Sequence, residues 1–212
     1  MAGHVKTLEE QLDAAGLRVF GACEKISAYG PDLLQHAPLL QDMTPAEADI
    51  LGASMRLIRA EPGQVIIREG DAGEWMLLVL KGTIDVTRRI EHGDEPPNAA
   101  PSEHAPPTPK EDDEPRAKDD GPARPEFSRV AVVKRGASIG EMSMFDSELR
   151  YASCTAIDTV EAAAIGRHEI AILIRDHPAV GAKLLVKLTQ LMAQRLRNTS
   201  NQLVKLLRQQ SS

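Results

Sequence analysis

The chain has 212 residues, of which 42% are hydrophobic and only 3% aromatic, and its formal net charge is −6. This length accommodates one domain of ordinary size with attachments, and its core must be built from aliphatic side chains, methionine and alanine. The only cysteines, Cys23 and Cys154, lack the spacing of a disulfide framework or a zinc site, so we expect buried thiols and no metal. No apolar stretch is long enough for a signal peptide or a membrane span, which predicts a cytoplasmic protein that does not associate with membranes.

Residues 1–30 show a helical pattern, because apolar side chains recur at intervals of three to five residues up to a Gly-Pro pair. These side chains are Val5, Leu8, Leu12, Leu17 and Phe20. We therefore predict an N-terminal helical extension over 1–30, which either packs against the domain or serves as a partner-docking arm. A short helix is expected from Pro31. Another is expected after Thr44, since Thr44, Pro45 and Glu47 fit the cap, first turn and third position of a helix.

Short apolar segments separated by glycine-containing turns follow from about residue 54. Strands are predicted at 55–58, 64–68, 75–80, 83–89, 127–135, 150–157 and 159–165. Strands at intervals of about ten residues are typical of a small antiparallel barrel or jelly roll. The predicted fold is therefore mainly β with flanking helices: an antiparallel, jelly-roll-like β-roll over 31–166, N-terminal helices, and C-terminal helices over 167–212.

An insert at 92–126 interrupts the predicted strands. It holds nine of the fourteen prolines, ten acidic and four basic residues, and no large apolar side chain. Such a segment cannot bury enough surface to offset the entropy of ordering it, so we expect it to be disordered. It serves either as a passive spacer or as an electrostatic docking tail for a basic partner.

The most informative stretch runs from Gly136 to Thr155. Gly140 lets the backbone approach a ligand closely, and the short segment after it can form one helical turn with free N–H groups. Glu141 supplies a hydrogen-bond acceptor and Arg150 a fork-shaped cation. A ribose hydroxyl next to a phosphate fits this combination.

These residues resemble the phosphate-binding cassette of cyclic-nucleotide-binding domains. The matching segments are Gly140-Glu141-Met142-Ser143-Met144 and Arg150-Tyr151-Ala152. The resemblance implies that Glu141 holds the ribose 2′-hydroxyl and Arg150 the cyclic phosphate, with Gly140, Met142 and Ser143 beside the ligand. Tyr151 departs from the family, which has Ala, Ser or Thr there, and it either crowds the pocket or supplies a hydroxyl.

The final helix is expected over about 178–209 and carries a heptad seam. The seam residues are Leu185, Met192, Thr199 and Leu206 in one row, and Thr189, Leu196 and Leu203 in the other. This pattern predicts a parallel homodimer. The segment 192–200 resembles the dimer helix of catabolite-activator-type proteins, which implies that Thr199 and Ser200 receive the adenine amino group, one from each subunit.

No nucleophile with a base at recognisable spacing and no metal set is present in the sequence, so we do not expect an enzyme. No recognition helix follows the seam helix, so direct DNA binding is not expected either. The sequence thus predicts a cyclic-nucleotide sensor for cAMP or cGMP that acts as a regulatory dimer on an unknown effector protein. Two alternatives stay open: a degenerate β-roll scaffold that no longer binds nucleotide, and a variant that responds to cyclic di-GMP.

Overall fold

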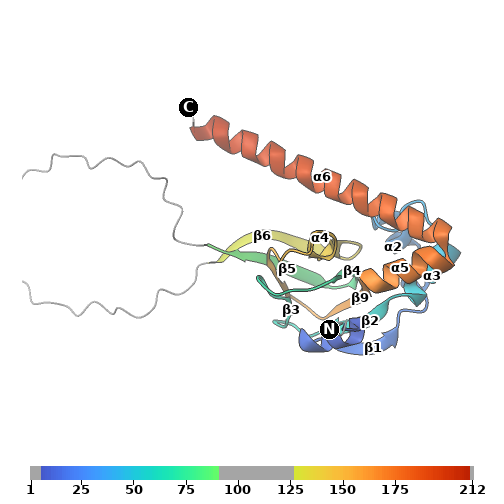
Figure 1. The fold of residues 1–212 in the computed structure, drawn as a ribbon. Coiled ribbons are helices and arrows are strands. Elements are labelled where there is room, and N and C mark those ends of the chain that lie inside the picture. Colours follow the sequence, from blue (N-terminus) through green and yellow to red (C-terminus); the bar gives the residue numbers. More distant parts are fainter. Residues whose placement is uncertain (1–5, 91–126, 211–212) are drawn as a thin grey trace, which may run out of the picture.

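The computed structural model describes residues 6–90 and 127–210, so the predicted disordered insert at 92–126 lies outside the described residues. Two antiparallel sheets form the roll, and a long C-terminal helix extends away from it (Figure 1). The first sheet has the order β1-β2-β9-β4-β7 and the second β3-β8-β5-β6. This arrangement confirms the predicted jelly-roll-like fold with flanking helices. The strands are β1 (Arg18–Ala22), β2 (Arg56–Ala60), β3 (Val65–Ile67), β4 (Trp75–Lys81), β5 (Thr83–Arg89), β6 (Phe127–Lys134), β7 (Ser138–Ile139), β8 (Ser153–Ala156) and β9 (Val160–Gly166).

The core of the roll lies between the sheets and around β4, in which every residue from Trp75 to Leu80 is buried. β4 pairs with β9 from Trp75↔Gly166 onward, and the alanines of β9 leave room for the larger side chains of β4. The tight β4–β5 corner requires glycine at position 82. Gly82 has φ +93°, and a Cβ there would lie 2.6 Å from the carbonyl oxygen of Thr159.

The N-terminal segment corrects part of the helical prediction. A helix α1 (Leu8–Ala14) is present, with a capping box between Thr7 and Glu10, but residues 18–22 form the edge strand β1 instead of a helix. Gly16, at φ +74°, ends α1, and the following residues pair with β2, as in Val19↔Ile58. Residues 18–22 pair with β2 at the edge of the sheet, and this pairing outweighs their helix-like apolar periodicity. The sequence alone could not reveal the pairing.

The remaining helices are the 3₁₀ turn η1 (Ile26–Tyr29), α2 (Pro31–His36), α3 (Pro45–Ala53), α4 (Glu141–Asp146), α5 (Arg167–Asp176) and α6 (Pro178–Gln210). Helices α2, α3 and α5 lie at one end of the roll, where α6 also begins, whereas α4 lies against the sheets near β4 (Figure 1). The capping box expected at Thr44 and Glu47 is present in α3.

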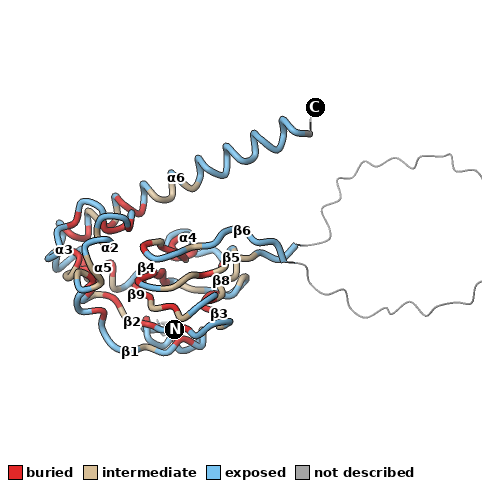
Figure 2. Tube along the Cα trace, turned by 180° about the vertical axis from the view of Figure 1, so that it is seen from behind, coloured by how far each residue is buried: buried red, intermediate tan, exposed pale blue. Residues whose placement is uncertain are grey.

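Helix α6 has two unlike halves (Figure 2). Val180, Leu184 and Leu188 are buried against the helical end of the core, whereas Leu196 and Leu203 are exposed. Lys183 fixes the buried half, since its Nζ lies 2.7 Å from a carboxylate oxygen of Glu47. The helix is therefore anchored at its start, while the second half presents apolar side chains outward.

Candidate functional site

The glycine at position 140 positions the predicted cassette. Gly140 has φ +81° and precedes α4, and a Cβ at this position would lie 2.8 Å from Nη1 of Arg150. Only glycine therefore lets the chain turn here while the Arg150 guanidinium packs directly against the backbone. Glycine at this position brings the first residue of α4, Glu141, and Arg150 of the following loop to the same place.

Glu141 is completely buried, and its two carboxylate oxygens have different surroundings. Oε1 accepts a hydrogen bond from the guanidinium of Arg195 on α6. Oε2 has no hydrogen-bond partner among the described residues. A buried acceptor without a donor is costly, so this oxygen is suited to receive a hydroxyl from a ligand.

Arg150 is 4% exposed and lies in a slot formed by backbone and one aromatic ring. Its Nη1 donates to the carbonyl oxygen of Gly140 and its Nη2 to that of Trp75, each at 2.7 Å. The guanidinium carbon lies 4.5 Å from the centroid of the Trp75 ring. Burial lowers the pKa of Arg150 to about 10, so the group remains a cation at neutral pH. Because the two carbonyls use only part of its five N–H donors, the guanidinium can still bind an anion.

The other predicted cassette residues occupy different environments. Ser143 is buried, and its hydroxyl lies 3.4 Å from the carbonyl oxygen of Leu149, whereas Met142 is exposed. Tyr151 is 54% exposed, its hydroxyl accepts a 2.7 Å hydrogen bond from Arg88, and the Arg88 guanidinium stacks over its ring. The Tyr151 side chain is thus held against β5.

Thr199 and Ser200 lie on the exposed half of α6 and do not meet the cassette of their own chain. Their hydroxyls donate to helix carbonyl oxygens one turn earlier, at 3.1 Å for Thr199 to Arg195 and 2.9 Å for Ser200 to Leu196. A role for the pair would need a second copy of the chain, so their contact with adenine stays a prediction.

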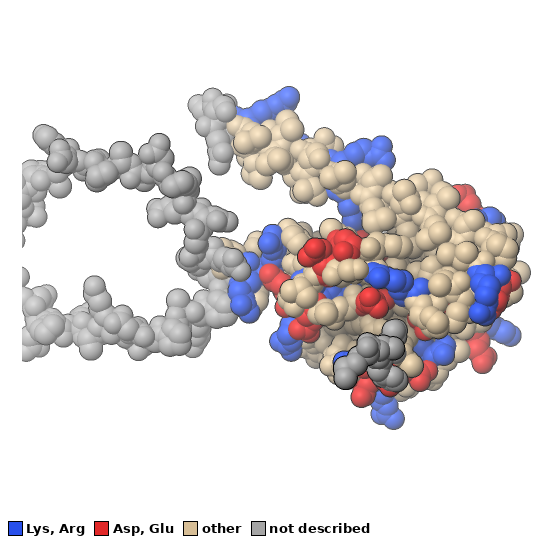
Figure 3. All heavy atoms as spheres, in the orientation of Figure 1, with Lys and Arg blue, Asp and Glu red and all other residues tan. Residues whose placement is uncertain are grey.

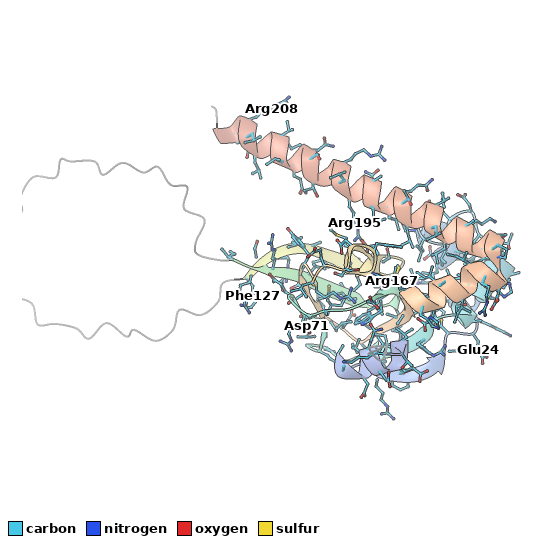
Figure 4. All side chains as sticks on the ribbon, viewed as in Figure 1. Glu24, Asp71, Phe127, Arg167, Arg195 and Arg208 are labelled. Atoms are coloured by element: carbon cyan, nitrogen blue, oxygen red, sulfur yellow. The ribbon has the colours of Figure 1, made fainter. Side chains whose placement is uncertain are left out.

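Arg195 is the residue that sequence reasoning missed. It projects from α6 toward the roll (Figure 4), where it contacts Glu141 and donates a 2.6 Å hydrogen bond to the carbonyl oxygen of Ser138. One signal was available in the sequence. Arg195 precedes Thr199 by four residues, one helical turn, so both share a face of α6. Arg195 therefore connects the cassette directly to the helix.

The thiol of Cys154 is not activated as a nucleophile. Cys154 is buried in the wall of the roll, and burial raises the pKa of its thiol to about 12, which keeps the thiol protonated. Within residues 6–90 and 127–210, no group of three or more His, Cys, Asp and Glu side chains is arranged to hold a metal ion.

In the same part of the chain, no helix combines the length and apolarity needed to cross a bilayer.

Comparisons with known proteins agree with the family resemblance. No family model matches the chain. A CRP-like cAMP-activated global transcriptional regulator of Mycobacterium tuberculosis is 22% identical over 176 residues, which cover 83% of this chain. The cyclic AMP receptor protein of Thermus thermophilus is 25% identical over 170 residues, 80% of this chain. In each case the match covers 62% of the relative's length, so this chain spans less than two thirds of these relatives.

A solved structure extends the likeness to nearly the whole fold. A cyclic-nucleotide-binding domain from Methylobacillus flagellatus is 25% identical, has a TM-score of 0.68 and aligns over 95% of both chains. The relatives and this neighbour are cyclic-nucleotide-binding domains and regulators. The predicted resemblance to cyclic-nucleotide-binding domains is therefore confirmed, while the ligand contacts of Gly140, Glu141 and Arg150 stay predictions.

Proposed function

We propose that this chain is a non-enzymatic regulatory domain that binds a cyclic mononucleotide, preferentially cAMP, between Glu141 and Arg150. The proposal rests on a buried Glu141 oxygen to which no described residue donates, together with the buried, pre-positioned guanidinium of Arg150. The oxygen would accept a ribose hydroxyl, and the remaining Arg150 N–H groups would bind the cyclic phosphate. The names of the M. tuberculosis and T. thermophilus relatives, which specify cAMP, support the choice of ligand.

The output would pass through Arg195. A ligand hydroxyl at Glu141 would change how strongly the carboxylate holds Arg195, and Arg195 belongs to α6. A ligand can shift a conformation only through different affinities for two states, and this contact supplies such a difference. We infer that the exposed apolar half of α6 pairs with a second copy, and that Thr199 and Ser200 then reach the nucleobase.

The effector would be a protein that contacts the dimer. Helix α6 contains Lys and Arg but no Asp or Glu, whereas both signs of charge are mixed on the face of the roll shown in Figure 3. A partner that docks along α6 should therefore carry acidic side chains. The positive charge of α6 thus indicates an effector with an acidic docking surface.

The decisive experiment is calorimetric titration of the full chain with cAMP, cGMP and cyclic di-GMP. We expect cAMP to bind the wild type, Glu141→Gln to weaken this binding, and Arg175→Gln to leave it unchanged. Arg175 is a matched control because it pairs with Asp176 on the surface of α5, away from the cassette. If none of the three nucleotides binds, the result favours a β-roll scaffold that no longer binds nucleotide. A preference for cyclic di-GMP favours a variant that responds to that ligand.

A further inference from the structure

A second concave site lies beside the cassette. A cavity of about 500 Å³ opens between the C-terminal end of α1 and the turn that joins β3 to β4. Arg150 and Trp75 contribute to its wall, but Glu141 and Ser143 do not, so it is separate from the proposed ribose site. The cavity is partly open to solvent, and its volume falls in the usual range of small-molecule pockets.

Small residues create the space and hydrogen bonds keep it open. Ala14 at the end of α1, Ala15 and Gly16 just after it, and Ala72 of the turn line the cavity. The chain around them is tied at two points. The Gln11 side-chain oxygen accepts a 3.2 Å hydrogen bond from the Glu74 N–H, and the Gln64 side chain donates a 3.0 Å bond to the carbonyl oxygen of Gly16. With Leu8 and Leu12 buried beneath, α1 cannot easily move inward to close the cavity.

The lining specifies the charge of an occupant. The residues that line the cavity include two arginines, Arg68 and Arg150, and one aspartate, Asp71, so the lining carries an excess of one positive charge. Arg68 has no carboxylate partner among the described ion pairs. Trp75 and Val65 are also among the residues that line the cavity. A cation would meet two arginines here, whereas a monoanion with a flat apolar body meets a cation and an aromatic surface.

We propose that the cavity between α1 and the β3–β4 turn is a second ligand site, which takes a small aromatic monoanion held by Arg68 and Arg150. The site does not depend on the proposed nucleotide function. Where both ligands bind, they share Arg150. Occupancy of one site then alters affinity at the other by a reciprocal factor.

The test uses the single tryptophan of the chain, Trp75, whose fluorescence reports directly on the cavity wall. The probes are benzoate and phenyl phosphate, with benzamide as the neutral analogue of benzoate. We expect both anions to change Trp75 fluorescence saturably, and benzamide to have no such effect. Arg68→Gln should weaken anion binding about tenfold or more, since it removes a charge-assisted hydrogen bond.

Two cavity-filling variants and one surface control complete the experiment. Ala15→Leu and Ala72→Leu should each abolish the anion response while cyclic-nucleotide affinity is measured separately. Arg59→Gln, an exposed arginine on β2 that does not line the cavity, should behave like the wild type. The proposal is overturned if neither anion binds, if benzamide binds equally well, or if Arg68→Gln and both leucine variants respond like the wild type. Loss of nucleotide binding alone would count against the proposed function and not against this site.

Discussion

Replacement of Arg150 separates two roles that the structure assigns to one side chain. The guanidinium is proposed to bind the cyclic phosphate, and it also donates to the carbonyl oxygens of Gly140 and Trp75. Arg150→Ala removes both roles, whereas Arg150→Lys keeps the positive charge but loses the planar fork. The pair of variants therefore distinguishes recognition of an anion from support of the surrounding backbone.

The expected magnitudes follow from these contacts. Truncation of one member of a buried, hydrogen-bonded charge pair costs about 2–5 kcal/mol, so Arg150→Ala should weaken nucleotide binding by roughly thirtyfold or more. The variant also removes two charge-assisted hydrogen bonds to backbone carbonyl oxygens, which costs at least about 1 kcal/mol each. With about 2–4 °C for each kcal/mol in a chain of this size, the thermal midpoint should fall by at least about 4 °C.

The assay is calorimetric titration with cAMP at a temperature where circular dichroism shows each variant to be folded. We expect Arg150→Lys to bind more weakly than the wild type and more tightly than Arg150→Ala. Arg175→Gln serves as the control, since its partner Asp176 lies on the surface of α5. Wild-type affinity in folded Arg150→Ala would refute the assignment of the phosphate to this residue.

Three further predictions concern residues outside the Arg150 slot. Thr199→Leu replaces a polar seam residue, so it should tighten dimerisation without ligand and make dimerisation less dependent on cAMP. Sedimentation equilibrium with and without cAMP measures both effects. An unchanged dimer dissociation constant would contradict the predicted heptad seam. Tyr151→Phe should keep cAMP affinity within about threefold in calorimetry, because the hydroxyl lost is an exposed one bonded to Arg88. Lys183 lowers the pKa of Glu47 from 4.5 to about 2, so its contribution to stability is complete above pH 4.5 and is lost as the pH falls toward 2. The Glu47→Gln variant should therefore melt below the wild type at pH 7, and the difference should shrink in melts at successively lower pH; a constant difference would exclude the ion pair as its cause.

The sequence predicted the strands well where local signals were strong. All seven predicted strands exist, with small shifts in their ends. They could be predicted because the apolar run that forms each strand and the glycine turns that end it lie within a few residues of each other in the sequence. The strand at Arg18–Ala22 was missed, since its partner β2 begins only at Arg56 and no local pattern records that pairing. The two-residue β7 was missed as well, because a pair of residues carries no periodicity.

The site shows the same division between local and long-range information. Gly140, Glu141 and Arg150 lie within eleven positions of one another, so their spacing alone suggested an anion site. Arg195 meets Glu141 from 54 residues away, and Trp75 meets Arg150 from 75 residues away. Contacts at such separations depend on how the sheets and α6 pack. They therefore cannot be predicted from composition or from the spacing of residues along the chain.

Helix α6 can carry a signal because its three parts are held differently. Its first turns are buried and fixed by Lys183, so they cannot move without disturbing the core. Its middle touches the cassette through Arg195, whose side chain is 42% exposed and is bonded to Glu141 and to the carbonyl oxygen of Ser138. Its end, from Leu196 onward, has apolar side chains in water, which favours association. When a nucleotide binds at Glu141, the anchored start of α6 should therefore move least, and the end that we propose to pair with a second copy should move most. The dimer contact is thus the part of the molecule where nucleotide binding should have its largest effect.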